Sequence, residues 1–403
     1  MNATLTDQAR LRLSRGFAII CLATLMGGLG IGMVSPLLPV FAEEMGASGI
    51  WLGLAFSGFA ITQTPLTPFM GRLSDRFGRK LFLAGGMLIY SLAALGYVFS
   101  PTYQILTAFR IFSGVGAAMF FPVAFAYVGD LAPRGMEGRY MGLFNVAFLV
   151  GWGAGPVLGG LFKDSLGTDA TFWAMMVMSA IAFVVVALLL PRPRPEAQRE
   201  SPSNGGVPML GVLKDRVVSA ICTFELIWGL GFGGVFAFLP IFMTDNLGTT
   251  ATAVGIVIST RAILNGVLVY PYGWLADRVN RVRLMMLGAT LGAIGTFAVP
   301  WMTGFAPLLL LFAITGLFES MSVPAGTAIA VERGRHLGMG SVMGLYSMSW
   351  SVGMLIGSVA GGIIQDFSGI ENVFRYGAVV VLFGVGIFYL MMRRAQYAKE
   401  TVG

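Results

Sequence analysis

Four ionisable side chains stand inside otherwise apolar stretches of the sequence: Arg110, Glu225, Arg261 and Glu319. A charge at the centre of a membrane helix costs about 2.5–3.5 kcal/mol on insertion scales, so each of these residues needs a compensating role. Burial disfavours the ionised form of a carboxyl group, and a nearby cation favours it. Such groups could take up a proton on one side of a membrane and release it on the other. The structural alternative is a static ion pair, or a carboxyl group kept protonated and hydrogen-bonded, that braces the fold.

Membrane-spanning helices are needed to hold these side chains. The 403 residues are 56% hydrophobic and only 11% charged, whereas soluble domains carry about 25% charged residues. A span needs about 20 mostly apolar residues, so we predict an all-α membrane protein with twelve transmembrane helices. The apolar runs place them near residues 17–41, 50–70, 81–99, 104–128, 140–162, 171–190, 219–244, 252–274, 284–302, 307–329, 342–364 and 373–392.

The chain repeats itself at an offset of 202 residues. The segment Gly71–Arg76 returns as Gly273–Arg278. Small residues at helical spacing let two membrane helices approach closely, and one such series also occurs twice. It comprises Gly142, Gly151, Gly155, Pro156, Gly159 and Gly160, and then Gly344, Gly353, Gly357, Ser358, Gly361 and Gly362. We therefore predict two pseudo-symmetric six-helix bundles, residues 1–190 and 217–403, joined by a polar cytoplasmic linker over 191–216.

These motifs resemble those of the major facilitator superfamily of secondary transporters. The helix from Gly142 to Gly160 resembles the antiporter motif of its twelve-helix drug/proton antiporters. Arg110, with Gly114 and Gly116, is similar to a third motif of the family. The segment that resembles the superfamily's cytoplasmic loop motif contains Gly71, Asp75, Arg76, Gly78, Arg79 and Lys80.

The resemblance implies roles for several residues. Arg110 is linked to proton transfer in the antiporters that it resembles. The loop motif implies a gate made by Asp75, Arg76 and Arg79, in which the Asp bonds a helix of the other half. The second copy supplies Asp277, Arg278 and Arg281, with Val282 in place of Lys80. In such transporters substrate binds in the cavity between the halves, and we expect Glu225, Glu319, Arg261 and Arg110 to face it.

The distribution of charge indicates how the chain lies in the membrane. The net charge is +7, and Lys and Arg gather before the first helix and in alternate loops. By the positive-inside rule both termini face the cytoplasm, which suits a multi-pass protein of the bacterial inner membrane. This explanation of the basic charge is preferred to nucleic-acid binding. A polar stretch of some sixteen residues precedes the first apolar run, so no cleavable signal peptide is expected.

The sequence favours transport and argues against catalysis. No phosphate-binding loop, nucleophile elbow or metal-ligand cluster occurs, so we predict no enzyme, cofactor or metal. Cys21 and Cys222 lie in apolar runs, which does not indicate a disulfide framework. Adaptable methionine and aromatic surfaces suit varied apolar ligands. Candidate substrate contacts are Gln63, Asn145, Phe148, Trp152, Phe224, Trp228, Phe232, Phe318, Met321, Met348 and Trp350.

The predicted function is proton-coupled export of amphipathic drugs or other hydrophobic small molecules by alternating access, by a monomer. Two buried carboxylates favour cationic or neutral substrates. Three alternatives remain: export of a defined solute such as a sugar or siderophore, flipping of a lipid or lysolipid, and a non-transporting sensor.

Overall fold

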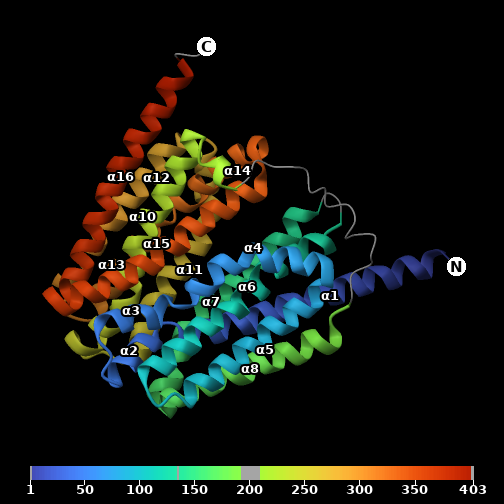
Figure 1. The fold of residues 1–403 in the computed structure, drawn as a ribbon, viewed down its shortest axis with the longest axis horizontal. Helices are drawn as coiled ribbons and strands as arrows, with labels where there is room; N and C mark the ends of the chain where they lie inside the picture. The colour runs from blue at the N-terminus through green and yellow to red at the C-terminus, as the bar shows by residue number, and fades with distance from the viewer. Residues whose placement is uncertain (1, 134–135, 192–208, 401–403) are drawn as a thin grey trace. The chain divides into compact units, whose positions relative to one another are not determined.

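The protein is described here by a computed structural model that covers residues 2–133, 136–191 and 209–400. Over these ranges it consists of helices without any β-strand (Figure 1), which confirms the predicted all-α fold. The first half contains α1 (Asn2–Val34), α2 (Leu37–Glu44), α3 (Gly49–Ser57), α4 (Phe59–Phe77), α5 (Arg79–Val98), α6 (Tyr103–Leu131), α7 (Glu137–Leu166) and α8 (Thr168–Leu189). The second half contains α9 (Met209–Val212), α10 (Arg216–Ile241), η1 (Phe242–Asn246), α11 (Ala251–Ala276), α12 (Arg281–Phe297), η2 (Val299–Trp301), α13 (Phe305–Glu319), α14 (Ser322–Leu337), α15 (Met339–Ser368) and α16 (Ile370–Glu400).

Eleven segments of the described chain are long and apolar enough to cross a membrane. The remaining predicted segment, residues 50–70, is present as α3 and α4, which are separated at Gly58. Helix α3 has only nine residues, and α4 ends in the charged loop motif with Arg72, Asp75 and Arg76, so neither reaches the required length and hydropathy alone. The helical content and the apolar spans confirm the predicted class of membrane protein.

The 202-residue repeat extends to the ends of the helices. Helices α5 and α12 begin at Arg79 and Arg281, and α8 and α16 begin at Thr168 and Ile370. The glycine before each of the latter two helices has a left-handed backbone, with φ of 90° at Gly167 and 86° at Gly369. Glycine adopts this conformation without the steric cost that a Cβ atom imposes. The two halves therefore have matching helices, and each half has the same glycine turn before its last helix.

Contacts divide the chain into two compact units. Unit 1 comprises Met1–Leu37 and Gly58–Pro202, and unit 2 comprises Leu38–Ser57 and Ser203–Gly403. Within unit 2, the backbone N–H of Gly49 at the start of α3 donates to both carboxylate oxygens of Asp366, at 2.9 and 3.1 Å. The hydroxyl oxygens of Ser57 and Ser358 lie 2.5 Å apart. Residues 38–57 thus pack with the second repeat, although the predicted boundaries, which remain predictions, assign them to the first bundle.

The repeated glycines bring helices into backbone contact within each unit. In unit 1, a Cβ atom at Gly155 would lie 2.7 Å from the Cα of Gly32, so α7 lies directly against α1. In unit 2, a Cβ atom at Gly357 would lie on the backbone of Leu230, so α15 lies directly against α10. The first residue of the series differs, because a Cβ atom at Gly142 would meet no atom of the described chain within 4 Å. Pro156 and Gly160 are buried in α7, and Gly151 and Gly159 make close contacts like that of Gly155.

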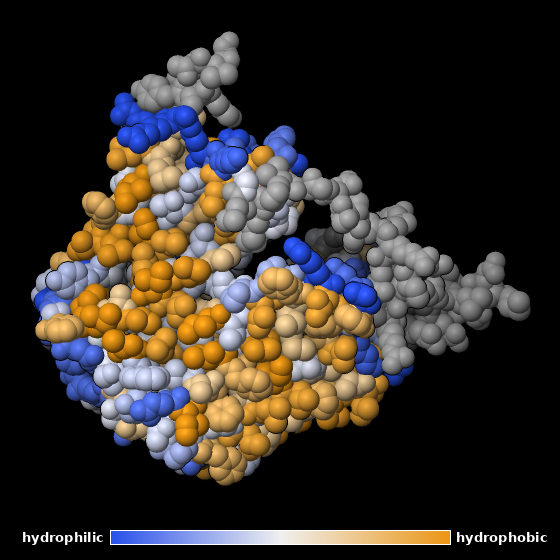
Figure 2. Space-filling view, viewed as in Figure 1, coloured by the Kyte–Doolittle hydropathy of each residue, from blue (hydrophilic) through white to orange (hydrophobic). Residues whose placement is uncertain are grey.

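Apolar side chains also cover the outer flanks of the helices. Leu188 is 73% exposed at the end of α8, and Phe383 is 73% exposed on α16. The space-filling view shows apolar residues over much of the viewed face, with hydrophilic residues gathered toward the helix ends (Figure 2). A soluble protein rarely exposes so much contiguous apolar surface, whereas a bilayer would cover it.

Candidate functional site

The centre of unit 2 holds an ion pair between two helices. Arg261 on α11 donates to Oε2 of Glu319 at the end of α13, from Nε at 2.8 Å and also from Nη2. Both side chains are about nine-tenths buried. The guanidinium carbon of Arg261 lies 4.4 Å from the ring centre of Phe236 and 5.4 Å from that of Phe232 on α10. Two of the buried charges identified from the sequence are therefore in direct contact, held against two aromatic faces.

Glycines make room for this pair. A Cβ atom at Gly292 on α12 would lie 2.9 Å from Oε1 of Glu319 and would collide with its Cγ. A Cβ atom at Gly316 on α13 would lie 3.2 Å from the Cα of Arg261. The close approach of α11, α12 and α13 thus depends on two positions without side chains, and it fixes where the two charges meet.

A cavity of about 30 Å³ adjoins the ion pair inside unit 2. Its volume has room for one or two water molecules. Its polar lining consists of Arg261, Glu319, Thr296 and Thr315. The apolar lining comprises Trp228, Gly231, Phe232, Val235, Phe236, Ala289, Ala293, Val299, Phe312, Gly377, Ala378 and Val381.

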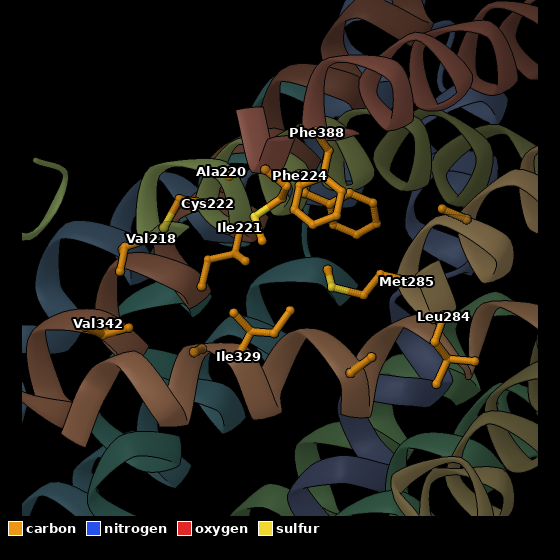
Figure 3. Close-up of a cluster of buried hydrophobic side chains, with 14 of the residues drawn as sticks. Val218, Ala220, Ile221, Cys222, Phe224, Leu284, Met285, Ile329, Val342 and Phe388 are labelled. Carbon is orange, nitrogen blue, oxygen red and sulfur yellow. The ribbon is translucent and has the colours of Figure 1, made fainter. Parts of the chain in front are cut away.

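Glu225 lies on α10, away from this cavity. It is partly buried, and the hydroxyl of Tyr346 on α15 forms a side-chain hydrogen bond with its carboxylate. Tyr346 in turn bonds the side chain of Thr327 on α14. Directly beside Glu225, Phe224 belongs to the apolar core of unit 2, part of which is drawn in Figure 3. Within the described part of the chain, Glu225 is thus a carboxyl group in an apolar setting with one hydroxyl partner, which differs from the ion-paired Glu319.

Arg110 is a deeply buried cation of unit 1, with 2% of its surface exposed. It donates from Nη2 to the hydroxyl of Ser35 at 3.0 Å, and its guanidinium carbon lies 4.7 Å from the ring centre of Phe59. The repeat offset relates Arg110 to Phe312 and Phe59 to Arg261. In unit 1 the arginine lies on α6 and the phenylalanine on α4. In unit 2 the arginine lies on α11, the counterpart of α4, and the phenylalanine on α13, the counterpart of α6.

Four of the candidate substrate contacts fall into aromatic groups, one group in each unit. In unit 1, the ring of Phe148 lies 5.5 Å from Phe121 and 6.3 Å from Trp152. In unit 2, the ring of Phe232 lies 4.0 Å from Phe236 and 4.8 Å from Trp350.

The other predicted contacts lie outside these groups. Phe224 is 3% exposed and packs on Phe388, so its visible role is structural. Trp228 and Met321 pack against the same core. Gln63 and Phe318 are partly buried, whereas Asn145 and Met348 are exposed within the described structure.

The loop motif forms a network of charges within each unit. In unit 1, Arg79 pairs with Asp75 at 2.8 Å, with Asp130 at the end of α6, and donates to the Ser74 hydroxyl at 3.2 Å. Arg76 lies over the ring of Phe77. A charge-assisted bond is stronger than a neutral hydrogen bond, so Arg79 ties α4, α5 and α6 together. The predicted bonding of Asp75 to the other half remains a prediction.

Unit 2 repeats this network with longer contacts. Arg281 lies 3.3 Å from Asp277 and 3.0 Å from Glu332 on α14, and Arg278 lies over the ring of Trp274 at 3.6 Å. Asp130 and Glu332 were not among the residues predicted from the sequence. The repeat offset relates these two acids to each other, and this signal could have identified them. Phe236 was also missed, although it follows Phe232 by one helical turn.

Among the described residues, no three His, Cys, Asp or Glu side chains gather closely enough to bind a metal ion. The chemistry that the described arrangement offers is proton transfer at carboxyl groups and the binding of apolar or charged molecules.

Known proteins share both the sequence and the fold. The chain is 28% identical over 397 residues to an uncharacterised MFS-type transporter of Methanocaldococcus jannaschii, which covers 95% of this chain and 100% of that protein. It is 29% identical over 382 residues to Multidrug resistance protein 2 of Bacillus subtilis, covering 92% and 94%. The crystal structure of a bacterial homologue of the human lysosomal transporter Spinster matches its fold with a TM-score of 0.78 at 14% identity, covering 95% and 97%.

The profile of the Major Facilitator Superfamily matches residues 20–244 and again residues 221–402. The two matches correspond to the two copies of the 202-residue repeat, and both consist of apolar helices. The motifs, the helices and the sequence profile agree, so the chain belongs to the Major Facilitator Superfamily, a family of membrane transporters that are not enzymes.

Proposed function

We propose that this protein is a proton-coupled exporter of amphipathic small molecules, cationic or neutral, in the bacterial inner membrane. It works by alternating access as a monomer, with both termini in the cytoplasm. The observation that carries the proposal is the placement of Glu225, Glu319 and Arg261 within membrane-spanning helices of unit 2. Intramembrane charges of this kind are costly and mark ion or substrate pathways.

The surroundings of these charges support an amphipathic substrate. Phe232, Phe236 and Trp350 form a group of large rings next to Arg261, and Phe148 and Trp152 form one in unit 1. Aromatic faces bind apolar rings and also attract cations. The relative from Bacillus subtilis is named a multidrug resistance protein, which supports a broad substrate range of the same kind here.

The two carboxyl groups would divide the work of coupling. Glu225 has a single hydroxyl partner, so its charge depends directly on protonation and on any cation that comes near. Glu319 holds Arg261 in an ion pair, and loss of its charge by protonation would weaken that contact. A cationic substrate and a proton then compete for the same negative charge, which is the requirement for exchange in opposite directions.

One experiment tests this function. Purified protein in weakly buffered detergent solution is mixed with cationic dyes, sugars and lysolipids, and proton release is recorded. We expect release with amphipathic cations, because a bound cation displaces the proton, and no release from Glu225→Gln. Release with sugars or lysolipids alone would contradict the proposed substrate class and favour an alternative transporter.

The charge network of unit 1 leads to a prediction about gating. Asp75→Asn is expected to slow transport while substrate affinity in detergent stays nearly unchanged, because the residue lies at the end of α4 with Arg79 and not beside the aromatic groups. Transport assays in vesicles and ligand binding by fluorescence would measure both quantities. Asp277→Asn is the matched control, with a smaller effect expected because the contacts of Arg281 are longer. A loss of affinity alone in Asp75→Asn would contradict the gating role.

The contact between α3 and α15 inside unit 2 allows a test of whether these two helices separate during transport. The hydroxyl oxygens of Ser57 and Ser358 lie 2.5 Å apart, close enough for a pair of cysteines to form a disulfide. With Cys21 and Cys222 replaced, oxidation of Ser57→Cys/Ser358→Cys is expected to stop transport, and reduction should restore it. Continued transport by the fully cross-linked protein would mean that α3 and α15 need not separate. Each single cysteine variant serves as a control.

A further inference from the structure

The residues that line the cavity beside Arg261 and Glu319 differ in type from their counterparts in the first repeat. The lining residues on α12 and α16 include four small ones: Ala289 and Ala293 on α12, and Gly377 and Ala378 on α16. The repeat offset relates these positions to Met87, Ser91, Met175 and Met176 of unit 1. Met87 and Met175 are fully buried, so side chains fill in unit 1 the positions that border the void in unit 2.

The two charged residues beside the cavity also have no charged counterpart in the first repeat. Glu319 corresponds to Ala117 and Arg261 to Phe59 in the first repeat. The second repeat thus has an ion pair surrounded by small residues. At the corresponding positions the first repeat has Ala117 and Phe59 in place of the ion pair, and larger side chains such as Met87 and Met175 in place of the small residues. A cavity that is lined only by apolar groups stays dry, whereas one with several polar partners holds water. This cavity has Glu319, Arg261, Thr296 and Thr315 on its wall.

One oxygen of Glu319 is left for a further partner. Both contacts from Arg261 go to Oε2, and within the described residues Oε1 accepts no hydrogen bond. Oε1 is also not sealed off, since it is absent from the buried polar atoms that have no partner. A carboxylate oxygen can accept about two hydrogen bonds, and Glu319 lines the cavity, so water in the cavity can supply them.

We propose that this cavity is a site for bound water and that Oε1 of Glu319 receives its proton there. The inference rests on the proposed proton-coupled function and specifies the proton's place within unit 2. A protonated water cluster donates one proton to Oε1: an O–H bond of the hydronium breaks, an O–H bond of the carboxyl group forms, and neutral water remains. Glu319 becomes neutral and its ion pair with Arg261 is lost.

The arginine keeps other partners when this happens. Its guanidinium remains over Phe236 and Phe232, which attract the cation through their ring faces. Among the described residues on the cavity wall, Arg261 on α11 and Glu319 on α13 are charged; those from α10, α12 and α16 are uncharged. The charged residues Glu332 and Arg333 of α14 pair with Arg281 and Asp215 instead. The charges at this site are therefore those of Glu319 and Arg261.

Two substitutions at one position test the proposal. Ala293→Val fills the cavity, and Ala293→Gly widens it without adding a side chain. Infrared spectra of the full-length protein in lipid are recorded as the pH is lowered, and the band of a protonated carboxyl group is assigned to Glu319 by its loss in Glu319→Gln. Transfer into D₂O shifts this band as the proton is replaced by deuterium.

We expect rapid exchange in the wild type and in Ala293→Gly. In Ala293→Val it should be slower by roughly tenfold or more, because exchange then requires local opening of the helix bundle. If Ala293→Val does not fold, Ala378→Val fills the same cavity from α16. Equal exchange rates in wild-type and filled proteins would overturn the proposal, as would the lack of any Glu319-dependent band.

The test of the water site can be distinguished from the test of the proposed function. If exchange depends on cavity size but Glu319→Gln still transports against a proton gradient, the water site stands and the coupling role of Glu319 falls. If Glu319→Gln stops transport but the filled variant exchanges like the wild type, the coupling role stands and the water site falls.

Discussion

Glu225→Gln is expected to abolish proton-driven export, down to the level of vesicles without the protein. Glutamine has nearly the shape of glutamate and can still bond the hydroxyl of Tyr346, so folding and substrate binding should persist. It cannot ionise, and a step that requires gain and loss of a proton at this position therefore stops. The measurement is uptake of a fluorescent cationic dye into everted vesicles after an imposed pH gradient.

The control for this result is Glu371→Gln. Glu371 lies in the first turn of α16 and pairs with Arg375 at an exposed position, at 3.0 Å. Exposed pairs contribute about 0–1 kcal/mol, so export and stability should change little. Gradient-driven export by Glu225→Gln at the wild-type rate would contradict the coupling role of Glu225. It would leave Glu319 as the acid to examine.

Gly357→Leu is expected to lower the stability of the folded protein strongly. A Cβ atom at this position would lie on the backbone of Leu230, 2.7 Å from its Cα, so α15 and α10 would have to separate along their length. Overpacking of a core typically costs about 1–3 kcal/mol, and a clash with backbone is harder to relieve than one with a flexible side chain. Thermal unfolding in detergent would show a large fall in the melting temperature and loss of folded yield.

Gly142→Leu provides the matched comparison. This glycine belongs to the same motif in the first repeat, but a Cβ atom there would meet no described atom within 4 Å. The substitution should leave the melting temperature close to that of the wild type. Equal destabilisation by Gly142→Leu and Gly357→Leu would mean that the glycines act through chain flexibility rather than through close helix packing.

Several features of the fold were predicted from residue types and spacing. The 202-residue offset between Gly142 and Gly344 predicted two copies of one unit, and the copies share helix ends and the turn at Gly167 and Gly369. The buried charges Arg261 and Glu319 were identified by their polarity within apolar runs. Such features are local, so a single chain segment suffices to reveal them.

Other features involve residues that are far apart in the sequence. Arg261 and Glu319 are 58 positions apart, and their pairing depends on how closely α11 approaches α13 at Gly316. The bond between Tyr346 and Glu225 and the cavity beside Glu319 likewise require particular helix rotations. Sequence periodicity indicates which face of a helix is apolar, but not which neighbour that face meets.

The amino-acid sequence alone determined that this chain crosses the membrane many times, that it is a duplicated unit, and where its costly charges lie. These properties follow from hydrophobicity, charge and repetition along one dimension. Only the tertiary structure decided that Arg261 is held by one oxygen of Glu319, that Asp130 joins Arg79, and that residues 38–57 pack with the second repeat. Those outcomes depend on close packing between helices, where glycine positions set the distances and one ångström decides whether two side chains can bond.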